Sequence, residues 1–172
     1  MKKIILIGMK GCGKTTVGKL LAKKLNIDFI DSDTEIENLH RKEKGETLTF
    51  REIFKKYGED YFNDLDEKCL KNILKVFNNQ SFVFACAGRT PFRPKNQKLL
   101  KTMGKIIYLK PDKEVLYRRI MQNGIPPFFP YQDDPRKSFE ELLARRGSIY
   151  EKIADTILRC GLKTPNEIIK LI

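Results

Sequence analysis

Histidine is nearly absent from this sequence, and its cysteines stand far apart. His40 is the only histidine, and no two cysteines form a C-x-x-C pair. The sequence therefore contains no recognisable zinc site. Scattered thiols of this kind are typical of a reduced, cytoplasmic protein, and we expect that location. The four cysteines are Cys12, Cys69, Cys86 and Cys160.

Long apolar runs are also lacking. No stretch approaches the roughly 18 apolar residues of a membrane span, and the apolar run near the N-terminus is too short for a secretory signal. With 172 residues, the chain is long enough to bury a full core without metal or disulfide support. We therefore expect one domain over residues 1–172 and no membrane partner.

One motif is complete. Gly8–Thr15 fits the phosphate-binding loop (P-loop) pattern G-x-x-x-x-G-K-S/T at every fixed position. The apolar Lys3–Ile7 precedes it as a strand, and apolar residues at helical spacing follow over Thr15–Asn26. This arrangement directs backbone N–H groups and a positive helix end at one anion. The loop residues expected to bind a nucleoside triphosphate are Gly8, Gly11, Cys12, Gly13, Lys14, Thr15 and Thr16.

Two side chains of this motif have separate expected roles. Lys14 is expected to reach the β- and γ-phosphates, and the Thr15 hydroxyl is expected to bind Mg²⁺. The net charge of +12 also raises the question of nucleic acid. Many lysines lie on helical segments whose outer faces are solvated, and a positive field steers small anions inward equally well. We therefore expect small-molecule ligands and no nucleic acid.

Strand and helix patterns alternate along the chain. This order predicts an α/β fold, a single P-loop domain with a five-stranded parallel sheet and helices on both faces. The strands are expected at Lys3–Ile7, Asp28–Ile30, Phe82–Ala87, Lys105–Leu109 and Ala154–Leu158.

Several helices have recognisable start signals. Thr49–Glu52 and Ser138–Glu141 fit the capping-box pattern. Thr164–Glu167 adds proline at the first helical position. The longest helix is expected over about Glu59–Phe77. In contrast, the segment 123–137 contains four prolines and a glycine, so it is not expected to form a regular helix. Such a segment is typical of a lid over a binding site.

Two carboxylates follow the second predicted strand. Asp31 and Asp33 lie at its carboxyl end, which faces the same crevice as the phosphate-binding loop. One carboxylate near Mg²⁺ can hold its water shell. The other can orient an attacking hydroxyl and accept its proton. A simpler alternative is that Asp33 caps the next helix.

The chain resembles the shikimate kinases over nearly its whole length. The resemblance rests on Ile4–Gly18, Phe29–Glu37, Ile53–Phe62, Asn96–Leu109 and Leu142–Asp155. It implies that ATP and Mg²⁺ support phosphorylation of one hydroxyl of shikimate, a small cyclic acid. It also implies acceptor-binding helices over about residues 33–62 and a lid over about 123–137.

The resemblance implies a role for individual residues. Lys14 and Asp33 would be catalytic, Thr15 would bind Mg²⁺ directly, and Asp31 would act through the water shell of the metal. Arg119 and Pro165 would flank the adenine, although an exposed helical arginine and a helix start explain them equally well. The acceptor would be bound by Asp33, Asn63, Gly88, Arg89 and Arg146.

The acceptor side departs from the family pattern. Ala87-Gly88-Arg89 stands in place of three glycines, Asn63 in place of an arginine, and Asp66 in place of a glutamate. In the lid, Pro126 replaces an arginine. In one interpretation Arg89 compensates for the arginine lost at position 63. In the other, Arg89 fills the space of the acceptor ring.

These departures leave three functions open. The leading prediction is a kinase that converts shikimate to shikimate 3-phosphate. The alternatives are a kinase for another hydroxy acid or a nucleotide, and a nucleotide-binding regulatory protein without transferase activity. Arg136 or Arg93 could replace the lid arginine. We expect a monomer.

Overall fold

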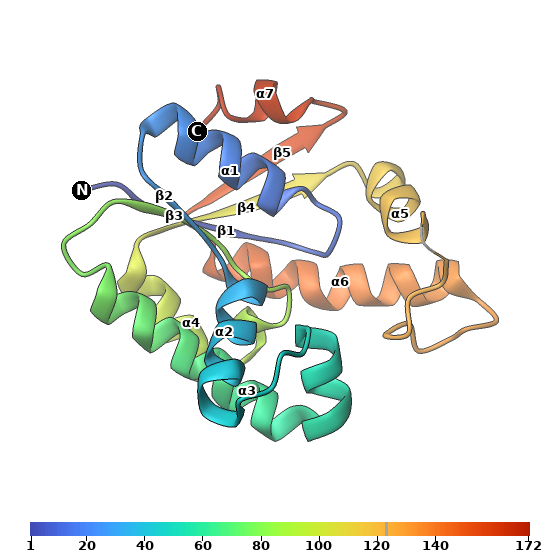
Figure 1. Cartoon of the computed structure of the whole chain (residues 1–172). Coiled ribbons are helices and arrows are strands. Elements are labelled where there is room, and N and C mark those ends of the chain that lie inside the picture. Colours follow the sequence, from blue (N-terminus) through green and yellow to red (C-terminus); the bar gives the residue numbers. More distant parts are fainter. Residues whose placement is uncertain (123) are drawn as a thin grey trace.

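The described residues form one parallel sheet with helices on both faces. The computed structural model describes residues 1–122 and 124–172. Its strands are ordered β2-β3-β1-β4-β5, and all pairs are parallel (Figure 1). This arrangement confirms the predicted α/β fold. The strands are β1 Lys3–Ile7, β2 Asp28–Asp31, β3 Phe82–Ala85, β4 Lys105–Pro111 and β5 Thr156–Gly161.

The central strand β1 is buried on both faces. Leu6 pairs with Ala85 on one side and with Ile107 on the other. Ile5 and Leu6 have no exposed surface. Because helices cover both faces of a parallel sheet, its inner strands are continuous apolar runs and do not alternate. The short run Lys3–Ile7 is therefore the centre of the core.

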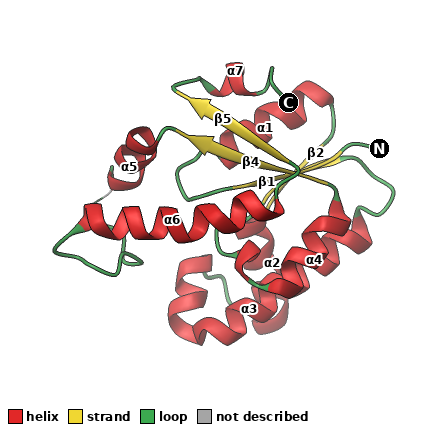
Figure 2. Ribbon diagram, turned by 180° about the vertical axis from the view of Figure 1, so that it is seen from behind, coloured by secondary structure: helices red, strands yellow, loops and turns green. Residues whose placement is uncertain are grey.

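The helices lie in two layers around this sheet. Figures 1 and 2 show α1 and α7 on one side of the sheet and α4 and α6 on the other. A 3₁₀ turn, η1, precedes α4. The elements are α1 Lys14–Leu25, α2 Ser32–Lys44, α3 Phe50–Val76, η1 Thr90–Phe92, α4 Pro94–Met103, α5 Lys113–Met121, α6 Pro135–Ile153 and α7 Pro165–Ile168.

Two of the predicted helix starts are confirmed. Thr49 and Glu52 form a reciprocal capping box at the start of α3, and Thr164 and Glu167 form another at α7. Within α3, Gly58 has φ 80° and ψ −177°, which breaks the helix into two parts. The helix predicted from Glu59 is the second of these parts. Its end at Val76 lies one residue before the predicted end.

The predicted capping box at Ser138–Glu141 is wrong. Helix α6 begins at Pro135, and the side chain of Asp134 caps it by accepting from the Lys137 N–H. Proline favours this start because its fixed φ suits the first helical position. Ser138 lies inside the helix, and its hydroxyl donates to the Tyr131 carbonyl at 2.8 Å. The irregular segment thus ends at residue 134 rather than 137.

The last strand also differs from its expected position. We expected Ala154–Leu158, but β5 spans Thr156–Gly161. Directly before this strand, the Asp155 side chain accepts from the Ile106 N–H of β4. The predicted strand Phe82–Ala87 ends earlier, at Ala85. None of the described helices is both long and apolar enough to cross a membrane.

Gly104 provides a test of the packing between α4 and the sheet. A Cβ at this position would lie 2.3 Å from the Lys3 carbonyl oxygen, so Gly104→Ala forces the backbone of β1 to move. We expect the free energy of unfolding to fall by about 1–3 kcal/mol in urea titrations. The control is Gly147→Ala inside α6, where a Cβ meets no atom within 4 Å. This change should raise the free energy of unfolding by about 0.5–1 kcal/mol. Equal effects of the two substitutions would contradict the packing described.

Candidate active site

The phosphate-binding loop joins β1 to α1 and depends on its glycines. Gly8, Gly11 and Gly13 have φ values of 143°, 81° and 96°. A Cβ on Gly8 would lie 2.8 Å from the Cys12 sulfur and 2.9 Å from the Leu109 carbonyl oxygen. Only glycine fits both this backbone conformation and this space. The loop therefore has the concave shape that a phosphate chain requires.

Lys14 is the first residue of α1 and bends back over the loop. Its ammonium group donates to the carbonyl oxygens of Gly8 at 2.8 Å and Met9 at 3.0 Å. It adds a full positive charge to the partial charge of the helix start. These features fit the phosphates of a nucleoside triphosphate.

Thr15 and Asp31 meet beside this loop. The Thr15 hydroxyl donates to Asp31 Oδ2 at 2.9 Å, which brings two oxygen ligands together from α1 and β2. Within the described part of the chain, no three histidine, cysteine or acidic side chains form a metal cluster. Mg²⁺ fits such a site because it usually keeps several waters and takes its remaining ligands from phosphates.

Asp31 also caps α2. Its Oδ1 accepts from the backbone N–H of Asp33 at 3.1 Å. The alternative in which Asp33 caps this helix is therefore wrong. The Asp33 carboxylate lies in the first turn of α2 and lines the cavity described below.

The pKa of Asp33 is raised to about 6. The main cause is burial, and the second is the nearby Asp31 carboxylate, while Lys14 acts in the opposite direction. A carboxylate with a pKa close to the working pH can both accept and release a proton. A pKa of this kind is expected of a general base.

A cavity of about 680 Å³ connects these groups with the acceptor side. Gly8, Cys12 and Asn63 are expected site residues that lie outside its lining. The ligand contacts expected of these three residues remain predictions. The expected residues that line it are Gly11, Gly13, Lys14, Thr15, Thr16, Asp31, Asp33, Gly88, Arg89, Arg119, Arg146 and Pro165.

Arg119 and Pro165 lie near the phosphate-binding loop. Arg119 comes from the last turn of α5, and Pro165 is the first residue of α7. A Cβ on Gly11 would lie 3.6 Å from the Arg119 Cβ. Both residues line the same cavity as Gly11, Gly13 and Lys14 of the loop.

Arg146 is a buried cation in the wall of this cavity. It is only 9% exposed, and its guanidinium lies 5.6 Å from the ring centre of Phe92 and 5.5 Å from that of Phe128. Its Nε has no hydrogen-bond partner, and no carboxylate among residues 1–122 and 124–172 forms an ion pair with it. Burial lowers its pKa, and the charge of Arg89 acts in the same direction. Such a guanidinium is suited to an anionic ligand.

Arg89 forms an ion pair with a residue of α3. Its Nη2 pairs with Glu59, directly after the break at Gly58, and its guanidinium lies 5.2 Å from the Phe54 ring centre. The side chain is half exposed. Next to it, the Gly88 carbonyl accepts from the Tyr150 hydroxyl at 2.7 Å. Arg89 thus lines the cavity while its charge is held at the solvent side.

Asn63 lies in the same helix as Glu59 and contacts an arginine through its backbone. Its carbonyl accepts from Arg93 Nη1 at 2.7 Å. Arg136 is bound on both sides by Glu114 and Glu140. Neither arginine lines the cavity, so neither takes the place of the lid arginine in this structure.

Sequence reasoning missed several residues that line the cavity. Lys10 occupies a variable position of the motif, so the pattern itself places no requirement on it. The aromatic residues fit core and cap patterns equally well. The additional lining residues are Lys10, Phe50, Phe62, Ala85, Cys86, Ala87, Gln122 and Phe128.

Asp66 lies behind the acceptor side and is almost fully buried. Its two oxygens accept from the Thr90 hydroxyl at 2.7 Å and from Asn96 Nδ2 at 2.9 Å. Burial raises its pKa to about 6 in spite of these bonds. Because Thr90 begins η1, Asp66 fixes the turn that carries Arg89.

These features define a class of protein. A glycine-rich loop between β1 and α1, a hydroxyl and carboxylate suited to Mg²⁺, and a second carboxylate facing an acceptor cavity are typical of P-loop kinases that phosphorylate small molecules.

Comparisons with known proteins give the family. A family model described as shikimate kinase matches residues 10–172. The shikimate kinase of Thermodesulfovibrio yellowstonii is 39% identical over 168 residues, covering 98% of this chain and 91% of that protein. That of Clostridium botulinum is 38% identical over 172 residues, covering 100% and 95%. The chain belongs to the shikimate kinase family, whose members are phosphotransferases that use ATP and Mg²⁺.

Solved structures agree with this assignment. The shikimate kinase of Acinetobacter baumannii, solved in complex with shikimate, superposes with a TM-score of 0.82 at 27% identity and covers 99% of this chain and 90% of that one. The shikimate kinase of Aquifex aeolicus gives 0.74 at 30% identity, with 98% and 92% covered.

The burial of Asp66 predicts a pH-dependent stability. Its pKa is higher in the folded state than its ordinary value of 3.8, so the folded state binds more protons between these values. Stability therefore falls as pH rises from about 4 to about 6. We expect the difference in free energy of unfolding between wild type and Asp66→Asn to change by about 2–3 kcal/mol across this range. Urea titrations at several pH values measure it, and a difference that does not depend on pH would contradict the burial of this carboxylate.

Proposed function

We propose that this chain transfers the γ-phosphoryl group of Mg-ATP to a hydroxyl of shikimate, giving shikimate 3-phosphate. The observation that carries the proposal is the buried Arg146 guanidinium, which lacks a carboxylate partner among the described residues and shares a cavity with Lys14 and Asp33. A ligand with one carboxylate and several hydroxyls suits Arg146 and Asp33, while Lys14 suits the phosphates of ATP. The relative from Acinetobacter baumannii, solved with shikimate, supports this choice.

On the donor side, the loop binds and orients the phosphates. ATP supplies the phosphoryl group, and Mg²⁺ reduces the repulsion between its oxygens. The backbone N–H groups around Gly11 and Gly13 face the phosphate chain. Lys14 stabilises the negative charge on the transferred group; Thr15 would bind the metal directly, and Asp31 would hold its water shell. Arg119 and Pro165 border the base.

On the acceptor side, side chains supply the chemistry. Asp33 accepts a hydrogen bond from the attacking hydroxyl and then takes its proton. Arg146 binds the carboxylate of the acceptor, for which the planar guanidinium provides two parallel donors. The ring is thereby held between its carboxylate and its reacting hydroxyl, so that the hydroxyl faces the phosphates.

Arg89 supplies the second cation for the acceptor carboxylate. It lines the same cavity as Arg146, and it can exchange Glu59 for a ligand because its present ion pair is half exposed. Exposed pairs of this type are held by about 1 kcal/mol or less. This replaces the arginine that the family has at Asn63.

The single domain 1–172 then consists of the sheet, acceptor-binding helices over about residues 33–62 and a lid over about 123–137. The part of the lid at Asn123 lies outside the described residues. The four buried free cysteines fit a reducing, cytoplasmic location. We expect the protein to act as a monomer on small molecules, without nucleic acid.

A second candidate is a kinase for a different hydroxy acid. The Arg89 side chain, which stands where the family has glycine, favours it because this side chain narrows the acceptor side. ADP release from Mg-ATP should be measured with shikimate and with a panel of other hydroxy acids, sugars and nucleotides. Turnover with shikimate alone supports the main proposal. ATP binding without any acceptor-stimulated ADP release would instead support a regulatory role.

Asp33 should control the acid limb of the pH profile. A base must be ionised to accept a proton, so kcat/KM should fall about tenfold per pH unit below the pKa of about 6. Asp33→Asn should lower kcat by about 10²- to 10⁴-fold while ATP still binds. An acid limb close to pH 4, or a variant with wild-type kcat, would rule out this role.

The exchange of arginines can be tested by reversal. Arg89→Gly should raise the KM for shikimate by up to about fivefold, since a half-exposed charge pair contributes about 1 kcal/mol or less. Adding Asn63→Arg to this variant should restore the KM. If Arg89→Gly alone improves turnover of shikimate, Arg89 obstructs the ring and the compensation is wrong.

A further inference from the structure

One cation of the cavity has no role in the function proposed above. Lys14 binds phosphates, Arg119 borders the base, and the other two arginines bind the acceptor. Lys10 remains, although it belongs to the phosphate-binding loop itself. The cations that line the cavity are Lys10, Lys14, Arg89, Arg119 and Arg146.

Lys10 lies on the acceptor side of the loop. Its Nζ is 5.7 Å from the ring centre of Phe128, the same ring that packs against Arg146. Its backbone nitrogen lies 3.9 Å from the position of a Cβ on Gly88. Burial lowers the pKa of Lys10, Arg51 acts in the same direction, and the Asp33 carboxylate opposes both. The charge of Lys10 therefore interacts with the Asp33 carboxylate, and its side chain lies near Phe128 of the lid.

The described lid residues bring no cation of their own into the cavity. Among residues 124–137, only Phe128 lines it, and Arg136 is bound by Glu114 and Glu140. Under the proposed function, the phosphoryl group passes from the loop toward the acceptor hydroxyl at Asp33, so a second cation near Asp33 adds to the charge that Lys14 supplies. Lys10 is the second loop cation that lines the cavity with Asp33, and its ammonium group lies near the lid residue Phe128.

We propose that Lys10 is a catalytic residue that contacts the phosphoryl group during transfer, held in place by the Phe128 ring of the lid. This rests on the proposed function. In the step, the bond from phosphorus to the leaving ADP oxygen breaks while a bond to the acceptor oxygen forms, and the hydroxyl proton passes to Asp33. Lys10 exchanges no proton, and its charge offsets the negative charge spread over the phosphoryl oxygens.

The first experiment uses Lys10→Met, which keeps the length of the side chain and removes its charge. We expect kcat with Mg-ATP and shikimate to fall about 100-fold, with the KM for ATP within about threefold of wild type. Lys10→Arg, which keeps the charge, should stay within about tenfold of the wild-type kcat.

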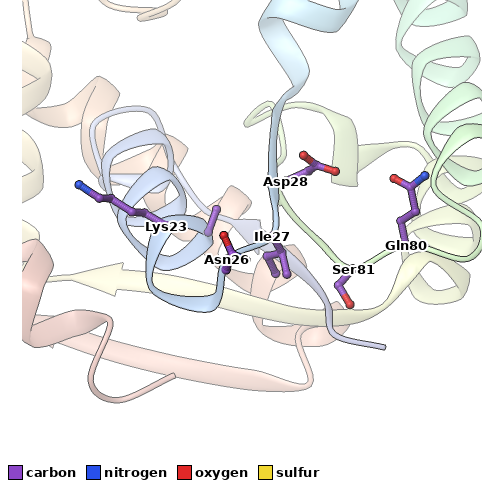
Figure 3. A pocket seen from close by; sticks show the side chains of 7 residues that line it. Lys23, Asn26, Ile27, Asp28, Gln80 and Ser81 are labelled. Carbon is purple, nitrogen blue, oxygen red and sulfur yellow. The ribbon is translucent and has the colours of Figure 1, made fainter.

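The matched control is Lys23→Met. Lys23 lies in a shallow hollow at the amino end of the sheet, together with Asn26, Asp28 and Ser81 (Figure 3). This hollow is opposite the phosphate-binding loop, so the substitution removes the same charge without touching the cavity. It should leave kcat unchanged, which separates a local contact from a general loss of positive field.

A binding measurement makes the result independent of the acceptor. Mg-ADP with aluminium fluoride mimics the phosphoryl group during transfer, and Lys10→Met should weaken its binding at least about tenfold while Mg-ADP alone binds as before. A kcat within about twofold of wild type, or a raised KM with unchanged kcat, would overturn the role of Lys10. If the wild-type chain does not phosphorylate shikimate, the proposed function fails, and the aluminium fluoride comparison alone decides on Lys10.

Discussion

The chain buries most of one cation, Arg146, in the wall of the cavity without giving its guanidinium a carboxylate among the described residues. Burying a charge in this way is unfavourable unless a partner of opposite sign is available. Two aromatic rings, Phe92 and Phe128, cover the group, and Tyr150 one turn later anchors α6 to the Gly88 carbonyl. The helix therefore holds a cation in a fixed position, and an anionic ligand recovers the free energy that this burial costs.

The two halves of the site differ in what builds them. The donor half consists mainly of backbone, namely glycines at positive φ and a helix start, so few side-chain changes are compatible with it. The acceptor half consists of side chains carried by α2, α3, α6 and the residue before η1. The differences from the family pattern at Asn63, Asp66 and Arg89 therefore lie on the side-chain half, and of these three only Arg89 lines the cavity.

The sequence was sufficient for features that depend on local patterns. The loop Gly8–Thr15 and the capping boxes at Thr49 and Thr164 depend on neighbours within a few residues, and the structure has them. The capping box predicted at Ser138 is wrong because Asp134 and Pro135 begin the same helix one turn earlier. Contacts between distant segments, such as Lys10 with Phe128, leave no signal in a single sequence because each residue fits its local pattern without the other.

The central claim is that the cations of this cavity recognise the carboxylate of a small hydroxy acid. The most direct test compares kcat/KM for shikimate with that for its methyl ester, which keeps every hydroxyl and removes the negative charge. Losing one partner of a buried charge pair costs about 2–5 kcal/mol, so we expect the ester to be at least about 30-fold poorer. Equal values of kcat/KM for the acid and the ester would contradict this account.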